Sequence, residues 1–251
     1  MFNFKSILDV TKEEWLNGLC ISEKEIPDIV IQEGSWWREE RQKLRLMHLE
    51  SVRELGFPDI YWGKWKDKKI VFCMTYGAPR ALEISHIFSK IGCKLVVQIG
   101  TCGGLQPYLS PGDIILPDHI SCEDGVARHF LKSNFVNASP KWIKLAEGLL
   151  KKQNRNVYIG KHVTFSSLFA ETKKMYEKWN KNGFLSVEME TATTVAAAIQ
   201  NNVDAISMVV VWDELTAGRR FMDPMTKEAL KELEISNETI FKVALSLSEK
   251  L

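Results

Sequence analysis

The sequence is short of the features that mark secreted, membrane and metal-binding proteins. Its five cysteines are odd in number, dispersed, and never form a C-x-x-C pair, which argues against a disulfide framework, a zinc site or redox chemistry. No apolar run approaches the roughly 20 residues that span a bilayer, and the first residues lack the basic and apolar segments of a signal peptide. We therefore expect a cytoplasmic protein with reduced thiols and no membrane contact.

The charges lack a bias of either sign. The chain has 33 Lys and Arg against 32 Asp and Glu, a formal net charge of +1, so no global field favours nucleic acid or an anionic membrane. A small ligand that is recognised locally fits this balance better. The sequence also has no clustered His, Cys and Asp ligand set, so we expect no metal and no organic cofactor.

The composition is that of a globular protein. Hydrophobic residues make up 45% of the chain and charged residues 26%, and there is no internal repeat or low-complexity tract. Because no composition shift divides the 251 residues, we expect one domain over residues 1–251.

Apolar runs and helical stripes alternate along the chain and predict an α/β fold. Residues 70–74 and 95–99 have the pattern of buried strands, and residues 79–91 between them form a helical stripe that Gly92 stops. This order implies a right-handed crossover between parallel, neighbouring strands. We expect further strands over 114–116, 163–165 and 205–211, and further helices from Pro140, over 191–200 and from a Ser236 cap. The predicted architecture is a central mixed, mostly parallel sheet flanked by helices.

The first sixty residues have a weaker pattern. The charged run over 38–45 fits either a surface helix or a flap. The tryptophans of this part fit a pocket cover, a subunit contact or simple packing; they are Trp15, Trp36, Trp37 and Trp62.

Three motifs follow predicted strands. In VQIGTCGG, residues 97–104, glycines let backbone N–H groups and a hydroxyl approach a ligand, although such turns are more often plain connections. In SVEMETAT, residues 186–193, Glu188 and Glu190 point the same way if the segment is extended, and two such carboxylates can grip vicinal sugar hydroxyls. The alternative places one glutamate at a helix N-terminus and the other in solvent.

The third motif, VVVWDE over 209–214, puts Asp213 at the carboxyl end of a strand, where open α/β sheets bind ligands. The same aspartate also fits the N-cap of a following helix. Because all three motifs fall at strand ends, we expect them to meet in one cleft.

Taken together, these motifs resemble those of the nucleoside phosphorylase and nucleosidase superfamily. VQIGTCGGLQPYLSPGDIILPD resembles the family's glycine motif with the "PGD" and strand that follow it, SVEMETAT its VEMEAA-type sugar motif, and VVVWDE its purine-contacting strand. TFSSLFAETKKMYEKW resembles the segment that supplies a base-stacking aromatic residue, and ISCEDGVARHF resembles uridine phosphorylases. The likeness covers roughly residues 69–213 in the family's order, whereas residues 1–65 match poorly.

The resemblance implies a role for each matching residue. It assigns Asp213 to protonate or hydrogen-bond N7 of a purine as the glycosidic bond breaks. The other implied contacts are Glu188, Met189 and Glu190 to the sugar, Phe169, Cys102 and Gly103 to the base, and Thr101, Gln98 and Arg80 to phosphate. It also implies a homo-oligomer, a nucleoside substrate and inorganic phosphate as co-substrate.

The sequence departs from the family pattern around the phosphate. Gln98 stands where phosphorolytic members have an arginine, and an amide does not replace a guanidinium's charge and fork. IQEGSWWREE, residues 31–40, is the best counterpart of their "PGDP" loop. Arg80, Arg38, Arg219 and Arg220 are the arginines that could supply replacement charge.

Two alternatives to phosphorolysis therefore stay open. Hydrolytic members also lack the phosphate arginine but carry an N-terminal glutamate that positions water, for which Glu33, Glu39 and Glu40 are candidates. Glu214 is a further acid beside Asp213. The other alternative is a nucleoside-binding protein without catalysis, which the presence of Asp213 argues against.

Overall fold

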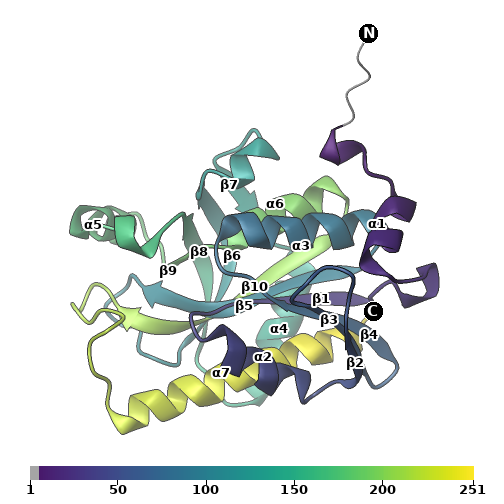
Figure 1. The fold of residues 1–251 in the computed structure, drawn as a ribbon. Coiled ribbons are helices and arrows are strands. Elements are labelled where there is room, and N and C mark those ends of the chain that lie inside the picture. The colour runs from purple at the N-terminus through teal and green to yellow at the C-terminus, as the bar shows by residue number, and fades with distance from the viewer. Residues whose placement is uncertain (1–5) are drawn as a thin grey trace.

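The computed structural model describes residues 6–251 as a ten-stranded mixed sheet between two layers of helices (Figure 1). The strands are β1 (Ile29–Gly34), β2 (Glu50–Glu54), β3 (Ile60–Trp65), β4 (Lys68–Met74), β5 (Leu95–Gly104), β6 (Ile114–Glu123), β7 (Phe135–Asn137), β8 (Val157–Phe165), β9 (Ser186–Glu188) and β10 (Asp204–Glu214). The helices are α1 (Lys12–Leu19), α2 (Arg38–Leu46), α3 (Ala78–Ile91), α4 (Pro140–Lys152), α5 (Lys173–Lys181), α6 (Thr191–Gln200) and α7 (Lys227–Ser248). The predicted fold class is confirmed.

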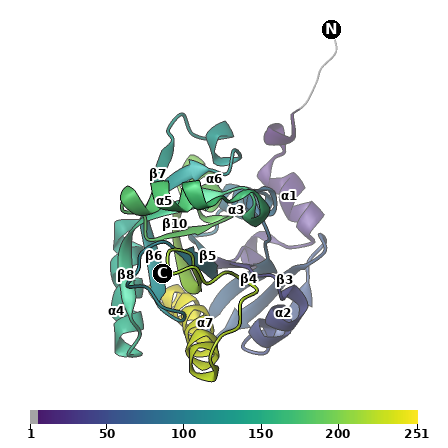
Figure 2. The same ribbon diagram turned by 90° about the vertical axis from the view of Figure 1, so that its left-hand side faces the viewer.

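The two helical layers are separated by the sheet. Helices α1, α3 and α6 lie on one face, and α2, α4 and α7 on the other (Figure 1). Helix α5 lies beyond the carboxyl ends of β5 and β10, the edge that faces the viewer in Figure 2. In the part of the chain that the structure describes, no helix combines the length and apolarity needed to cross a membrane.

The strand order brings the N-terminal part of the chain into the centre of the sheet. Strands β4 and β5 are parallel, as predicted, but they are not neighbours, because β1 pairs with both of them. All six residues of β1 are buried. The run IVIQEG is short and ends in polar residues, so its sequence alone does not predict a strand. The neighbouring strands β4 and β5 supply the pairing that makes it one. The run at 38–45 forms helix α2.

Part of the sheet closes on itself. Strand β5 pairs with β10 and β9, β10 pairs with β6, and β8 joins β6 to β9, so these five strands form a ring. The ring gathers the ends of β5, β9 and β10 around one opening, which positions all three motifs.

Local signals place most helix ends where the sequence predicts them. Pro79 lies in the first turn of α3, and Gly92 ends it with a φ of 106°, a left-handed conformation that favours glycine. The predicted Ser236 cap is wrong. Helix α7 begins after Thr226, whose side chain accepts a hydrogen bond from the Ala229 N–H, and Ser236 lies buried in the helix with its hydroxyl donating to the Gly112 carbonyl.

Candidate functional site

A solvent-open pocket of about 620 Å³ lies at the carboxyl ends of β1, β4, β5, β9 and β10. Thr101, Cys102 and Gly103 line it from β5, Glu188 and Glu190 from the β9–α6 junction, and Asp213 from β10. The three sequence motifs therefore meet in one cleft, as their positions at strand ends predict.

Glycine lets the strands and the Glu190 carboxylate approach each other closely in this pocket. A Cβ at Gly34 would lie 2.7 Å from Glu190 Oε2, and a Cβ at Gly100 would lie 2.6 Å from the Gly34 carbonyl oxygen. Both distances are shorter than side chains tolerate. The glycines at the ends of β1 and β5 thus admit the carboxylate to the pocket wall.

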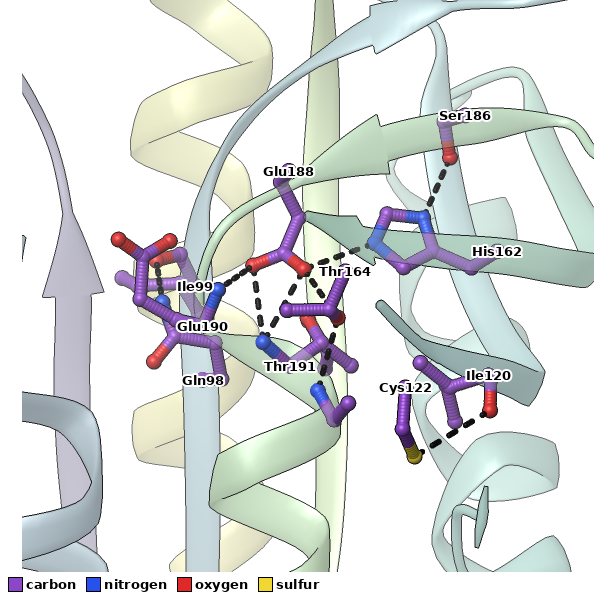
Figure 3. Close-up of polar contacts among 12 residues, drawn as sticks. Gln98, Ile99, Ile120, Cys122, His162, Thr164, Ser186, Glu188, Glu190 and Thr191 are labelled. Atoms are coloured by element: carbon purple, nitrogen blue, oxygen red, sulfur yellow. Dashed lines mark hydrogen bonds and ion pairs between the residues drawn. The ribbon is translucent and has the colours of Figure 1, made fainter. Parts of the chain in front are cut away.

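The two glutamates of SVEMETAT do not point the same way (Figure 3). Strand β9 ends at Glu188, and Glu190 precedes the first residue of α6. The Glu188 carboxylate accepts hydrogen bonds from the backbone N–H groups of Glu190 and Thr191, the Thr164 hydroxyl and His162 Nε2. The expectation of two parallel carboxylates is wrong, because the helix N-terminus turns the chain after Glu188 and takes up its carboxylate.

Opposite shifts in pKa separate these two carboxyls. Burial alone would raise the pKa of Glu188, but the hydrogen bonds from His162, Thr164 and the Glu190 backbone, with the charge of His162, hold it below 4.5. Burial first, and then the charge of Glu188, raise the pKa of Glu190 well above its usual range. The surroundings therefore favour the charged form of Glu188 and the protonated form of Glu190.

Glu190 remains available to a ligand. Its Oε1 accepts a hydrogen bond from the Gly77 N–H, while Oε2 is directed toward Gly34 at the pocket wall. Met189 also lines the pocket, beside Glu190. The carboxyl of Glu190 is thus the member of the pair that can meet a sugar hydroxyl.

Asp213 is a buried acid at the other side of the pocket. Its side chain is 5% exposed, and Oδ1 has no hydrogen-bond partner. Burial raises its pKa to about 7, against the opposing charge of Arg219. A carboxyl in this state can donate a proton near neutral pH.

A second acid, Glu171, lines the same side. Its Oε2 accepts a hydrogen bond from the Tyr176 hydroxyl at 2.8 Å, and burial, with the charge of Asp213, raises its pKa to about 7. The sequence analysis gave Glu171 no role, although this residue lies within TFSSLFAETKKMYEKW, in the polar stretch between the short 3₁₀ helix η4 (Leu168–Ala170) and α5.

Aromatic rings form the mouth of the pocket. Trp36, Tyr76, Trp212 and Phe221 line it, and the rings of Tyr76 and Phe221 each lie 5.6 Å from Trp36 between centroids. Trp37 stacks on Trp212 at 4.7 Å. Trp36 therefore lines the pocket, and Trp37 packs against the lining residue Trp212. By contrast, Trp62 is part of the buried core and Trp15 packs against Phe57.

Phe169 is not among the residues that line the pocket. Its side chain is 84% exposed, and it touches the mouth only through an edge contact with Trp36 at 6.2 Å. The neighbouring Leu168 lines the pocket instead.

The residues expected at the phosphate separate into two groups. Thr101 lines the pocket, whereas Gln98 is buried in β5 and donates to the Ile99 carbonyl, with its own Oε1 unpartnered. Arg80 pairs with Glu83 at 2.9 Å and donates to the Pro58 carbonyl, away from the pocket lining. Cys102 lines the pocket as a neutral thiol, since burial raises its pKa well above the usual range.

The described part of the pocket wall contains four carboxyl side chains and no Lys, Arg or His. Arg38 lies close by, with its guanidinium 5.8 Å from the centroid of the Tyr76 ring. Arg219 donates to Glu214 and to the Trp212 carbonyl, behind Asp213. Arg220 pairs with Asp223 in solvent.

The N-terminal glutamates considered for water positioning do not line the pocket. Glu33 forms a buried bidentate pair with Arg45, with atoms 2.8 and 3.1 Å apart, and Glu39 pairs with Lys43 on the surface. Glu40 lines a different surface cavity, beside Trp37. Over residues 6–251, no group of His, Cys, Asp and Glu has an arrangement suited to a metal ion.

Comparisons with known proteins agree with this arrangement. A family model described as the phosphorylase superfamily matches residues 30–247. The DeoD-type purine nucleoside phosphorylase of Alkaliphilus metalliredigens is 28% identical over 208 residues, covering 81% of this chain and 86% of that protein. The guanosine phosphorylase of Halorubrum lacusprofundi is 24% identical over 205 residues, covering 80% and 85%. The crystal structure of uridine phosphorylase from Vibrio fischeri ES114 has the same fold, with a TM-score of 0.80, 19% identity and coverage of 99% and 100%.

Proposed function

Since the chain belongs to the phosphorylase superfamily, we propose that it cleaves the N-glycosidic bond of a nucleoside, with a purine as base and inorganic phosphate as second substrate. The bond between the sugar C1′ and the base nitrogen breaks, and a phosphate oxygen forms the new bond to C1′. The products are the free base and a sugar 1-phosphate. The names of the curated relatives support this choice of reaction and base.

The observation that carries the proposal is the state of Asp213. The leaving base gains negative charge as the bond breaks, and Asp213 holds a proton in the pocket at a pKa of about 7. Its buried Oδ1 has no hydrogen-bond partner in the protein. Donation of this proton to the purine neutralises the leaving group, which is a role that simple binding does not require.

The other walls supply binding and orientation. Glu190 is the group that meets the ribose hydroxyls, and the rings of Trp36, Tyr76 and Phe221 offer faces for stacking. Ser35 and Thr101 provide hydroxyls for phosphate, with Arg38 as the nearby cation. Phosphate is the only co-substrate in this scheme, and no organic cofactor takes part.

Hydrolysis is the second candidate, and the charge of the pocket favours it. Four carboxyls and no basic side chain line the described pocket, so a phosphate dianion lacks a direct counter-ion there. Water is neutral and needs no counter-ion in the pocket. None of Glu33, Glu39 and Glu40 is placed to orient that water, which weighs against this candidate.

Product analysis separates the candidates. Purified protein is incubated with purine and pyrimidine nucleosides, with and without phosphate, and free base, free sugar and sugar 1-phosphate are resolved by chromatography. Phosphorolysis predicts sugar 1-phosphate only when phosphate is present, whereas equal amounts of free sugar in both conditions would establish hydrolysis. Absence of base release from every nucleoside would leave a binding protein and refute the enzymatic proposal.

We also propose that the protein is a cytoplasmic homo-oligomer. Large apolar side chains remain exposed near the mouth and at the end of α2, among them Phe169, Met222 and Met47, which follows α2, and a second copy of the chain would cover them. The five free cysteines are consistent with a reducing compartment. Light scattering of the purified protein gives its mass, and a monomer at micromolar concentration would contradict the assembly.

A further inference from the structure

A buried histidine lies directly behind the sugar side of the pocket, outside every motif. His162 projects from β8 and is fully buried. Its Nδ1 lies 2.8 Å from the Ser186 hydroxyl, and its Nε2 lies 3.0 Å from Glu188 Oε1 (Figure 3). The ring thus links β8 to both ends of β9.

Glu188 needs a counter-charge at this depth. Its side chain is 3% exposed, and an unpaired carboxylate at such a site is strongly disfavoured. The other donors to its carboxylate are the Thr164 hydroxyl and the N–H groups of Glu190 and Thr191, all neutral. His162 is the one bonded partner that can carry positive charge.

Glu188 in turn holds the backbone of Glu190. Its Oε2 accepts from the Glu190 N–H at 2.7 Å and from the Thr191 N–H at 2.9 Å, which anchors the turn where β9 passes into α6. This turn directs the Glu190 carboxyl away from Glu188 (Figure 3). Glu190 Oε2 lies beside Gly34, at the pocket wall. The contacts therefore run without a gap from His162 through Glu188 to Glu190.

We propose that His162 is a positioning residue for the sugar: as hydrogen-bond donor and counter-ion it keeps Glu188 anionic and in place, and Glu188 orients Glu190 for the ribose hydroxyls. This inference rests on the proposed function, because it uses the contact between Glu190 and the sugar. His162 itself does not line the pocket.

Loss of His162 should change the orientation of Glu190 through its effect on Glu188. Burial first, and then the charge of Glu188, raise the pKa of Glu190 and favour its protonated form. Without His162, Glu188 loses a hydrogen bond and an electrostatic interaction that help to lower its pKa, so its charged form is disfavoured and the Glu188 contact that orients the turn weakens. Sugar binding then falls although the pocket lining is unchanged.

Three variants test this role: His162→Leu, which removes the hydrogen bonds and the charge; His162→Gln, which keeps a donor for Glu188; and Glu190→Gln. Ser236→Ala, buried in α7 and remote from the pocket, controls for general loss of stability. The Kd of a purine ribonucleoside, measured by calorimetry without phosphate, and kcat and KM with phosphate are determined for each, with His162→Leu also made in the Glu190→Gln background.

We expect His162→Leu to raise Kd and KM on the order of tenfold and to change kcat by less than about twofold. His162→Gln, which keeps a donor but carries no charge, should recover only part of this loss. In the Glu190→Gln background His162→Leu should add less than about twofold, because both act through one contact. A fall in kcat at unchanged Kd would contradict a positioning role in sugar binding, and effects that multiply in the double variant would show that His162 does not act through Glu190. Wild-type protein that binds nucleoside without turnover would refute the proposed reaction, while the Kd values would still decide the role of His162. A wild-type protein that binds no nucleoside would overturn both.

Discussion

The two acidic sides of the pocket differ in how many donors meet their carboxyls. On the sugar side, Glu188 accepts hydrogen bonds from four groups and keeps its charge, with a lowered pKa. On the base side, Asp213 has an unpartnered oxygen and a pKa raised to about 7. The difference shows that burial alone does not decide the state of a carboxyl. Donor-rich surroundings make it a fixed anion, and donor-poor surroundings make it a proton carrier.

The sharpest test of the proton-carrier role is Asp213→Asn. An amide of the same shape cannot give a proton to the leaving base, so kcat/KM should fall about 10²- to 10³-fold with a purine nucleoside. In the wild type, kcat/KM should also decline as the pH rises through about 7, because Asp213 must be protonated to act. Steady-state rates from pH 5 to 9 measure both effects. A variant that retains at least half the wild-type rate would remove Asp213 from the chemistry.

The fixed-anion role of Glu188 predicts a cost in stability. Glu188→Gln removes a buried charge that four donors satisfy, and we expect the free energy of unfolding at pH 7 to fall by about 2–3 kcal/mol. A group with a lowered folded pKa stabilises the protein above its unfolded pKa and loses this effect as the pH falls through the folded value. The difference from wild type should therefore shrink toward acid pH. Urea titrations at pH 7 and pH 4 check this, and a difference that stays constant would contradict it.

Asp213 should have the opposite dependence on pH. Its pKa rises from 3.8 to about 7 on folding, so the folded protein holds this proton more tightly, and the carboxyl destabilises the fold as the pH increases between these values. Asp213→Asn should thus be more stable than wild type by about 4 kcal/mol at pH 8 and by much less at pH 4. Denaturation at both pH values measures the gap. Equal gaps would show that burial does not disfavour the charge of Asp213.

Glu171→Gln should have the smallest effect. The amide oxygen can still accept the Tyr176 hydroxyl hydrogen bond, so kcat/KM should change by only about threefold. The decline in rate above pH 7 should persist, because it belongs to Asp213. Tyr176→Phe is the matched control, since it frees Glu171 without removing its charge. If Glu171→Gln abolished the alkaline decline, Glu171 rather than Asp213 would be the acid.

The sequence predicted which segments meet at the pocket better than it predicted where individual side chains point. Thr101 and Asp213 line one pocket because they lie near the carboxyl ends of the parallel strands β5 and β10, and Glu190 joins them from the turn after β9, which pairs with the end of β5. The exposure of Phe169 and the direction of Arg80 depend on loop packing, and no local pattern specifies these. Neither Glu171 nor His162 received a role from the sequence, since a glutamate in a loop and a lone histidine in a strand are common surface and core residues, even though Glu171 lies within a segment that resembles the family.

Local chemistry explains what the sequence determined by itself. The strands from residue 69 onward, the helix stop at Gly92 and the glycine-rich end of β5 follow from side-chain periodicity and turn residues, which act over a few neighbours. Only the tertiary structure decided that β1 separates β4 from β5. It alone brought His162 to Glu188 across 26 positions of sequence. Whether a buried carboxyl is a counter-ion or an acid depends on the donors that other strands bring to it, and spacing along the chain does not contain that information.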